Sequence, residues 1–392
     1  MRKIKLCFIL SNKPSYSETF LTLKFLYLKK NGYDIVFFSD NKKYLSTENI
    51  KSSKFKIIKF ISSIIAFFKL LLLSPSRVHK FLKLEKFDQV LLIKRWKHLF
   101  LNSRILQEKT DYLHFSFLTL SDTRENIASA IGAKMSASIR GFDISIYPLK
   151  NPGCYNKLWL KIDKLHSISN ALLVEAKNIG LPPNIKTHII EPSIDTEFFT
   201  NPLFLKSNFD NKKQKIHFLT IGRLHWKKGI EYTLEALAIF KEEYSNNFIY
   251  SIIGDGIEKE RLIYAVKSLG LDGFVEFKGT LKANEIKEFY MKSNVYLQYS
   301  IQEGFCNSVL EAQAMGLLVI ASNAEGLEEN IIDRQTGWIV KKYEPKLLAK
   351  KIENVINMKN YKLDLVRKNA IERVSKKFSK ENQMKLFKKF YD

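Results

Sequence analysis

Two cations set among glycines are the first residues of this sequence whose types and spacing suit a chemical role. Arg223 and Lys228 stand in the segment Gly222-Arg-Leu-His-Trp-Lys-Lys-Gly229, between an apolar run and a segment with helical spacing. The amino terminus of a helix and fixed positive charges both attract anions, and together they suit a diphosphate. Isolated cations are more often solvated, but this position between a predicted strand and a predicted helix favours anion binding.

Two glutamates further along the chain could bind the hydroxyl groups of a sugar. Glu303 begins the segment Glu303-Gly-Phe-Cys-Asn-Ser-Val-Leu-Glu311, in which helical spacing starts near Ser308. The first carboxylate therefore lies in a loop, the second lies about one turn into a helix, and both can point into one cleft. Because carboxylates accept hydrogen bonds from neighbouring hydroxyls, one can hold a ribose and the other a hexose. The alternative is a solvated helix with two surface acids.

Glycines and cysteines add weaker signals. Gly254-Asp-Gly256 follows an apolar run and would let the backbone approach a ligand closely, although in isolation an ordinary tight turn is the commoner explanation. Cys306 has no base paired with it by any local pattern, so we interpret it as a small lining residue rather than a nucleophile. Cys7, Cys154 and Cys306 are far apart, which indicates neither a disulfide framework nor a zinc site and fits a reducing cytoplasm.

The elements that must hold these residues alternate between short apolar strands and helical segments. This alternation predicts α/β domains in which a mostly parallel sheet is covered by helices on both faces. Ligands bind such sheets beyond the carboxyl ends of the strands, where the segments described above begin. The predicted strands are 3–10, 33–39, 89–93, 112–117, 134–140, 164–168, 187–191, 216–222, 251–253, 275–277, 295–298 and 319–322.

The chain is expected to form two Rossmann-like, doubly wound domains that face each other across a cleft. At 392 residues it is too long for one ordinary core. The alternating pattern lapses into Asp, Asn, Pro and Lys before a new strand at residue 216. We therefore predict domains at 1–195 and 216–375, joined by a linker at 196–215. A basic helix at 376–392 would follow, and it could pack back on the first domain.

Several motifs coincide with this organisation. The second half contains Gly222-Arg-Leu…Lys228-Gly229, Gly254-Asp-Gly256, Glu303-Gly-Phe…Glu311-Ala, Gly326-Leu-Glu-Glu329 and Asp333…Gly337…Val340. Together they resemble the family 4 glycosyltransferases, which have the two-Rossmann-domain GT-B fold. The resemblance is strong over 216–340 and looser before it. Ser17-Glu18-Thr19-Phe20 and Ile139-Arg140-Gly141-Phe142-Asp143-Ile144 resemble the subgroup that builds bacterial exopolysaccharide, including the colanic acid type.

The resemblance implies a hexosyltransferase that uses a nucleotide-diphosphate sugar, such as a UDP-, GDP- or ADP-sugar, and retains its anomeric configuration without a metal or other cofactor. The first domain would bind a membrane-proximal glycan or lipid-linked acceptor, and the second would bind the donor. The sequence agrees independently on the metal, because it contains no Asp-x-Asp pair. Fixed cations can stabilise the charge that develops on a departing phosphate.

The same resemblance assigns roles to individual residues. Arg223 and Lys228 would neutralise the leaving diphosphate, and Glu311 would hold the ribose hydroxyls. Glu303 would orient the donor sugar. The backbone amides of three residues would assist Glu303, and further residues would complete the donor site. The three amides belong to Phe305, Cys306 and Asn307, and the further residues are Gly222, Gly254, Gly256, Gly304 and Ser308.

The first half departs from the family pattern. Arg140 stands where many relatives have a histidine, and it could bind an anionic acceptor or the diphosphate, with Asp143 nearby. His114 lies in the predicted strand 112–117, and a polar functional role and a structural role are equally compatible with it. Ser17, Glu18 and Thr19 could face the donor phosphates, but we prefer a simple helix cap. Glu325 replaces a frequent glycine and could alter sugar selection.

The net charge of +24 attracts anions but does not select among them. A nucleic-acid-binding protein is therefore an alternative. Such a protein would need basic residues interleaved with exposed aromatics in one groove, and we recognise no module of this kind in the sequence. We expect no nucleic-acid partner. A GT-B enzyme with a different, soluble acceptor is a second alternative. No Gly-x-Gly-x-x-Gly follows the first strand, which counts against a dinucleotide.

Residues 51–100 carry twelve Lys or Arg against Glu85 and Asp88, and they include the apolar run 57–73. This run is shorter than the roughly 20 apolar residues of a spanning helix, so we expect it not to cross a bilayer. It is typical of an amphipathic segment at an anionic membrane surface, with a core helix as the competing interpretation. Since no cleavage site follows the first apolar run, we expect a cytoplasmic protein, peripheral on the inner face of the membrane.

Overall fold

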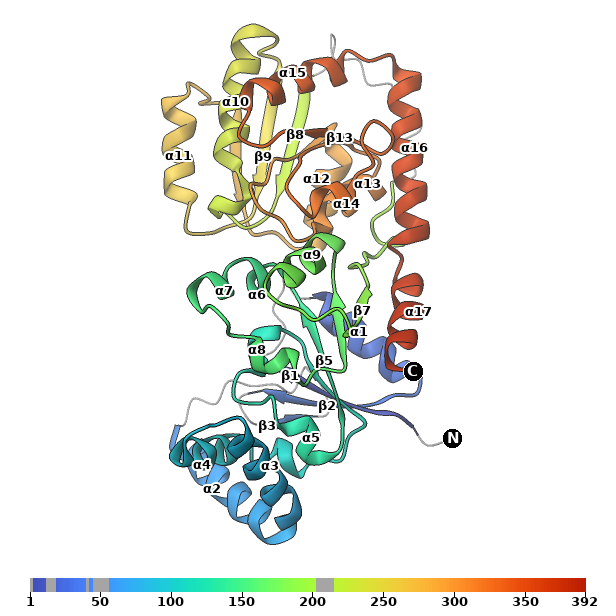
Figure 1. Cartoon of the computed structure of the whole chain (residues 1–392). Coiled ribbons are helices and arrows are strands. Elements are labelled where there is room, and N and C mark those ends of the chain that lie inside the picture. The colour runs from blue at the N-terminus through green and yellow to red at the C-terminus, as the bar shows by residue number, and fades with distance from the viewer. Residues whose placement is uncertain (1–2, 12–18, 40–41, 45–55, 202–214) are drawn as a thin grey trace. The chain divides into compact units, whose positions relative to one another are not determined.

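The computed structural model describes residues 3–11, 19–39, 42–44, 56–201 and 215–392. The chain divides into two compact units, each built on its own sheet (Figure 1). The first unit comprises Met1–Ile190 with Met384–Asp392, and the second comprises Glu191–Gln383. The division falls a few residues ahead of the predicted linker at 196–215. Most of that linker lies outside the described residues.

The first unit is a seven-stranded sheet in the order β3-β2-β1-β4-β5-β6-β7. Its strands are parallel except for β3, which is antiparallel to β2. The chain order changes direction between β1 and β4, as expected for a doubly wound sheet. The strands are β1 (Lys5–Leu10), β2 (Asp34–Ser39), β3 (Lys42–Tyr44), β4 (Tyr112–Phe115), β5 (Lys134–Ile139), β6 (Lys164–Ser167) and β7 (Lys186–Ile189).

Helices connect these strands, and one of them replaces a predicted strand. The strand expected at 89–93 is wrong, because Gln89 turns the chain with a φ of 58° and α4 begins at Leu92. A short apolar run fits a buried strand and a helix equally well. The helices are α1 (Thr19–Lys30), α2 (Lys56–Leu73), α3 (Pro75–Phe87), α4 (Leu92–Leu101), α5 (Ile127–Ile131), α6 (Gly141–Ser145), α7 (Tyr147–Lys150), α8 (Asn156–Trp159) and α9 (Asn170–Asn178).

None of the described helices is by itself long and apolar enough to cross a membrane. The segments Phe60–Leu73 and Pro75–Phe87 meet the length and hydropathy criteria only as a pair, and this pair bends by 102° at its break.

The end of the chain belongs to the core of the first unit. The last helix, α17 (Lys380–Tyr391), carries Phe387, Phe390 and Tyr391, each 2% exposed or less. Tyr391 lies 3.1 Å from the ring nitrogen Nδ1 of His114 and packs edge-on against Phe8. The final residues are therefore structural components of the first unit.

The second unit is a six-stranded parallel sheet in the order β10-β9-β8-β11-β12-β13. The chain order changes direction between β8 and β11, and ligands bind α/β sheets beyond the carboxyl ends of strands at such a point. The strands are β8 (Ile216–Ile221), β9 (Phe248–Ile253), β10 (Val275–Gly279), β11 (Val295–Gln298), β12 (Leu318–Ser322) and β13 (Trp338–Val340). The helices are α10 (Ile230–Glu243), α11 (Lys259–Ser268), α12 (Ala283–Lys292), α13 (Asn307–Ala314), α14 (Leu327–Asn330), α15 (Pro345–Ile356) and α16 (Asn360–Lys377).

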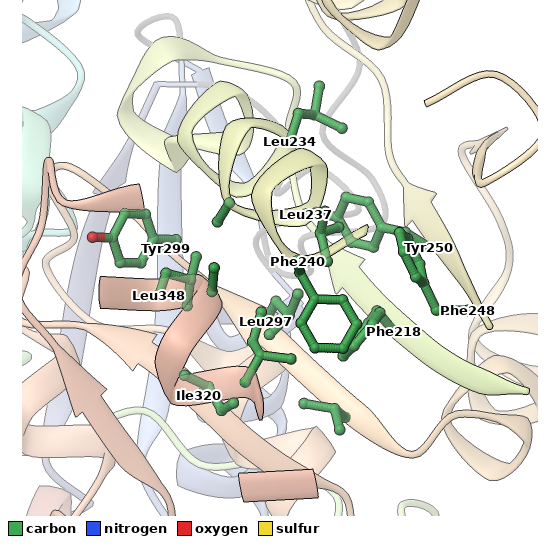
Figure 2. Close-up of a cluster of buried hydrophobic side chains, with 14 of the residues drawn as sticks. Phe218, Leu234, Leu237, Phe240, Phe248, Tyr250, Leu297, Tyr299, Ile320 and Leu348 are labelled. Carbon is green, nitrogen blue, oxygen red and sulfur yellow. The ribbon is translucent and has the colours of Figure 1, made fainter. Parts of the chain in front are cut away.

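Alternate residues of these strands enter two separate apolar clusters. Phe218 of β8 belongs to the cluster that contains α10, whereas Leu219 belongs to the cluster that contains α13. In the first cluster Phe218, Phe240 and Phe248 have ring centroids 5.6–5.9 Å apart (Figure 2). Because both faces of the sheet are buried, the strands are held rigidly, and so are the loops at their carboxyl ends.

Candidate functional site

The site forms where β8 and β11 end side by side. Phe218 pairs with Val295 in the parallel register, so the loops that follow these strands leave the same edge of the sheet. The loop after β8 leads through the short 3₁₀ helix η6 (Trp226–Lys228) into α10, and the loop after β11 leads into α13. The structure therefore brings together the two segments that the sequence singled out.

Lys228 and Glu303 form an ion pair between these two loops. Their side chains are 17% and 15% exposed, so the pair is shielded but reachable. Burial alone would lower the pKa of Lys228, but the Glu303 carboxylate outweighs burial, and the net effect raises the pKa above its ordinary value. The Ser300 hydroxyl also lies 3.3 Å from Glu303 Oε2. Lys228 is thus a firmly charged cation beside an acid.

The second predicted cation, Arg223, is exposed directly after β8. Within the described part of the chain it forms no ion pair with a carboxylate. A Cβ built on Gly222 would lie 3.4 Å from Lys228 Cε, so the Lys228 side chain runs over this glycine. Two cations therefore stand close to one glycine, an arrangement that suits a diphosphate.

Three glycines around the site let its loops pack against one another. A Cβ at Gly254 would lie 1.9 Å from the carbonyl oxygen of Gly222, and one at Gly256 would lie 2.2 Å from that of Leu224. A Cβ at Gly326 would lie 2.2 Å from the carbonyl oxygen of Gly304. The close approach predicted for Gly254 and Gly256 is therefore to a neighbouring loop of the same unit.

We predict that Gly254→Ala destabilises the second unit by about 3 kcal/mol and abolishes nucleotide binding, because its φ of 139° and the clash with Gly222 both oppose a side chain. Gly273→Ala is the matched control, since Gly273 also has a positive φ of 77° but has nothing within 4 Å of its added Cβ. Thermal unfolding of both variants measures the difference. Equal losses of melting temperature would contradict the packing role.

Glu311 lies on α13, where its Oε2 accepts a hydrogen bond from the Tyr290 hydroxyl at 3.0 Å. Burial raises the pKa of this carboxyl to about 7, although the bond from Tyr290 opposes the shift. Tyr290 belongs to α12 and lies far from Glu311 in sequence, so no local pattern predicted it. Glu311 is therefore a partly buried carboxyl with a pKa near neutral pH.

This titration predicts a pH-dependent affinity for nucleotide. A carboxylate that accepts bonds from ribose hydroxyls must be ionised, so below about pH 7 binding has to release a proton, and affinity falls up to about tenfold per pH unit. Calorimetric titration of a nucleoside diphosphate between about pH 6 and about pH 8 tests this. Glu311→Gln should bind more weakly and lose this component. An unchanged affinity in the wild type would contradict the role of Glu311.

Hydrogen bonds within the second unit engage polar groups of Cys306 and Ser308, two residues that were predicted to bind the donor. The Cys306 amide donates to Asn330 Oδ1 at 3.0 Å, and Asn330 Nδ2 donates back to the Cys306 carbonyl at 3.1 Å. The Ser308 hydroxyl donates to the Ile221 carbonyl at 3.1 Å and accepts from Tyr296 at 2.8 Å. These bonds help to fix the end of β8 and the start of α13, so the Cys306 amide and the Ser308 hydroxyl are already engaged within the unit.

The other two backbone amides of this loop are accessible to a ligand, whereas the Phe305 side chain and the Cys306 thiol are buried. Within the described residues, the amides of Phe305 and Asn307 have no acceptor, so they stay available to a ligand at the start of α13. The Phe305 side chain is buried and packs 5.7 Å from the Phe378 ring. Cys306 is 3% exposed and burial raises the pKa of its thiol, so it is a buried core residue rather than a lining one.

Glu325, which replaces a frequent family glycine, lies in a second ion pair. Its Oε1 is 3.0 Å from Lys342 Nζ, which also donates to the Ile301 carbonyl at 3.0 Å. The Gly326 amide donates to the Glu303 carbonyl at 2.8 Å, so Glu325 directly precedes a residue that is hydrogen-bonded to Glu303.

In the described residues, no group of three or more His, Cys, Asp or Glu is placed to hold a metal ion.

The candidates in the first unit have mainly structural positions. His114 is 0% exposed, and its ring nitrogens lie 2.9 Å from the hydroxyls of Ser136 and Ser138. Burial lowers its pKa well below the ordinary value, so it is a neutral core histidine, which corrects its assignment to acceptor binding. Ser17 and Glu18 lie outside the described residues. Thr19 begins α1, and its side chain also lies outside them.

Asp143 shapes the turn that holds Arg140. Its carboxylate accepts bonds from the amide and hydroxyl of Thr119 at 3.2 and 3.1 Å and from the Arg140 amide at 3.2 Å. Burial raises the pKa of Asp143 to about 6, against these bonds and the charge of Arg140. Asp143 is buried and cannot contact an acceptor, whereas Arg140 is partly exposed with its guanidinium 5.3 Å from the Phe117 ring.

Comparison with known proteins agrees with this geometry. Residues 204–373 match the family described as Glycosyl transferases group 1. A Salmonella typhimurium protein named as the colanic acid biosynthesis glycosyltransferase WcaL is 23% identical over 276 residues, which cover 68% of this chain and 66% of that protein. A Campylobacter jejuni alpha-1,4-N-acetyl-D-galactosaminyltransferase, whose name includes a PP-undecaprenol-linked glycan, is 32% identical over 161 residues, covering 41% of this chain and 44% of its own.

The fold has relatives among solved structures. HepE of Anabaena, crystallised with UDP and glucose, aligns with a TM-score of 0.68 and 16% identity over 99% of each chain. This likeness confirms the predicted α/β fold class with two Rossmann-like sheets. The alignment to WcaL spans just under two thirds of that relative's length.

Proposed function

We propose that this chain, a glycosyltransferase of group 1, moves a sugar from a nucleotide-diphosphate sugar to a glycan or lipid-linked acceptor in the biosynthesis of a cell-surface polysaccharide. The observation that carries the proposal is the Lys228–Glu303 ion pair, which lies at the switch point of a sheet within the group 1 domain. WcaL is named for colanic acid, the Campylobacter jejuni relative for a PP-undecaprenol-linked glycan, and HepE was crystallised with UDP and glucose. These names favour a nucleotide-sugar donor and an acceptor at a membrane.

The donor would bind through its diphosphate and its two sugars. Lys228 and Arg223 face the phosphates, Glu311 holds the ribose, and Glu303 orients the transferred sugar. When the bond between the sugar C1 and the phosphate oxygen breaks, negative charge grows on the diphosphate, and the two cations stabilise it. An acceptor oxygen bonds to C1 on the same face, and its proton leaves with the diphosphate or solvent. The anomeric configuration is thereby retained.

The charge compensation in this scheme comes from Lys228 and Arg223, so we propose that no divalent metal is needed. Excess EDTA should leave the transfer rate unchanged within the error of the assay. The measurement is sugar release from UDP-, GDP- and ADP-sugars, followed as nucleoside diphosphate formed in the presence of EDTA and after adding back magnesium. A strict requirement for the metal would contradict this prediction.

We also propose that the enzyme works in the cytoplasm, on the inner face of the membrane. Nucleotide sugars are phosphate esters made inside cells, and a reducing compartment fits three cysteines that are all free in the structure. Transfer to a lipid-linked acceptor in vesicles, compared with transfer to a soluble glycan, tests the acceptor class. Efficient use of soluble glycans alone would favour the alternative of a soluble acceptor.

A further inference from the structure

Helices α2 and α4 of the first unit present apolar side chains to solvent along neighbouring stripes. On α2 these side chains follow the helical period, at positions 61, 65, 68 and 72, and the stripe on α4 lies at 92, 93 and 96. Ordinary soluble surfaces scatter such residues singly and rarely expose a large continuous patch. The apolar ridge consists of Ile61 (52% exposed), Ile65 (63%), Phe68 (57%), Leu72 (78%), Leu92 (62%), Ile93 (84%) and Trp96 (43%).

The ridge is part of a folded surface. The opposite side of α2 is docked on the unit, because Ala66 and Leu70 are buried. Arg104 donates to the carbonyl of Ser62 and Gln107 to that of Ala66, each at 2.9 Å. A helix that is apolar on its docked side and also on its outer side fits a second apolar environment outside the protein.

Aromatic rings join the two stripes. Phe67 of α2 has its ring centroid 5.9 Å from Phe68, 6.5 Å from Trp96 and 5.6 Å from Phe100. Phe60 lies 6.2 Å from the same Phe100. Figure 1 shows α2, α3 and α4 gathered together at one side of the sheet of the first unit. The ridge is therefore one continuous surface.

The charges around the ridge have one sign. Lys69, Lys94 and Lys97 are exposed on the two helices, and α3 adds exposed lysines at 80, 83 and 86. The two acids between residues 60 and 101 are withdrawn from solvent. Glu85 is 0% exposed and lies 2.7 Å from His98 Nδ1, while Asp88 is paired with Lys161. The ridge is consequently apolar with a cationic border and no exposed carboxylate within these residues.

We propose that this ridge docks on the surface of an anionic bilayer, with its apolar side chains in the acyl boundary and the lysines among the lipid headgroups. Such a combination is typical of helices that lie in the plane of a membrane interface. The 102° bend between Phe60–Leu73 and Pro75–Phe87 fits segments that lie on the bilayer better than one that crosses it. This membrane surface would be where the proposed transferase meets a lipid-linked acceptor. The proposed function supplies only the reason for membrane binding, and the evidence for the binding itself is the ridge.

The test is flotation of the full chain with vesicles of phosphatidylcholine, with and without phosphatidylglycerol, in the absence of donor and acceptor. We expect the wild type to float with the anionic vesicles and to be released at high salt. The triple variant Ile65→Ser, Phe68→Ser and Ile93→Ser should lose on the order of a hundredfold in partitioning, since each side chain contributes apolar burial. Lys69→Gln, Lys94→Gln and Lys97→Gln together should weaken binding to anionic vesicles only.

A matched control removes three equally exposed apolar residues from the second unit. The combined Ile257→Ser, Tyr264→Ser and Leu365→Ser variant replaces side chains that are 85%, 74% and 59% exposed and should float like the wild type. Unchanged melting of both triple variants shows that folding is intact. The proposal is overturned if the wild type does not float, or if the ridge variant floats equally well. It is also overturned if the ridge only joins two copies of the chain, which would appear as a dimer that dissociates in the ridge variant. Since no sugar is transferred in this assay, its failure leaves the enzymatic proposal standing.

Discussion

Replacing Lys228 with Met lowers the rate of sugar transfer by on the order of 10²–10³-fold, because the departing diphosphate loses its best-placed cation. The side chain keeps its length and apolar stem, so the packing over Gly222 is retained. Its raised pKa means that Lys228 is charged throughout the neutral range, and the loss is therefore present at every pH in that range. Initial rates with a saturating nucleotide sugar measure the effect. Arg223→Ala, which removes the second cation, should also abolish transfer.

The neighbouring Lys227→Met is the matched control. Lys227 adjoins Lys228 in η6, but its Nζ lies 5.7 Å from the Trp226 ring and it has no ion pair within the described residues. The transfer rate of Lys227→Met should stay within about threefold of the wild-type rate, because a partly solvated charge without an ion pair contributes little. Glu303→Gln removes the acid that faces the donor sugar and breaks its ion pair with Lys228, but it leaves the Lys228 charge in place. This variant therefore tests the orientation of the sugar by Glu303 separately from the charge of Lys228. Wild-type rates for both Lys228→Met and Arg223→Ala would show that the diphosphate assignment is wrong.

Removing residues 384–392 is expected to unfold the first unit while the second keeps its structure. Phe387, Phe390 and Tyr391 are buried in the same apolar cluster as Phe8 and Phe25. Truncating one buried aromatic costs about 3–5 kcal/mol, so losing three exceeds or matches the whole stability of a typical domain, about 5–15 kcal/mol. Hydrogen-exchange mass spectrometry measures the two units separately and should show protection lost across the described residues of the first unit, including β1, α1 and β2, while the second unit stays protected.

The single variant Phe390→Ala should lower the free energy of unfolding of the first unit by about 3–5 kcal/mol. Lys388→Ala and Lys389→Ala provide the control, because both lysines are exposed on the same helix and neither side chain is part of the cluster. Normal protection of the first unit in the truncated chain would contradict the structural role of α17.

The sequence predicted the sheets well because buried parallel strands are short apolar runs separated by turn residues. It failed at 89–93, where Val90 to Ile93 has the composition of a strand but continues into α4. The run is too short for its periodicity to distinguish the two structures. It also left the end of the chain uncertain, since only tertiary contacts reveal that Tyr391 packs near His114.

For the site, the sequence located the segments but did not show how their side chains pair. The positions of Lys228 and Glu303 after two strands placed them at one edge, yet their direct contact depends on β8 and β11 being neighbours. His114, Asp143 and Cys306 had suitable chemistry but are buried, and burial cannot be read from residue type. Asn330 and Tyr290 were missed for the converse reason, because they reach the site from separate helices without a local motif.

We expect the site at the ends of β8 and β11 to bind a nucleoside diphosphate through Lys228 and Glu311. The direct test is a crystal structure with whichever of UDP, GDP or ADP raises the melting temperature most, since a ligand that binds only the folded state stabilises it. We predict a phosphate oxygen in hydrogen-bonding distance of Lys228 Nζ and the ribose hydroxyls on the Glu311 carboxylate. A nucleotide bound at full occupancy elsewhere, with both side chains turned away from it, would contradict the account.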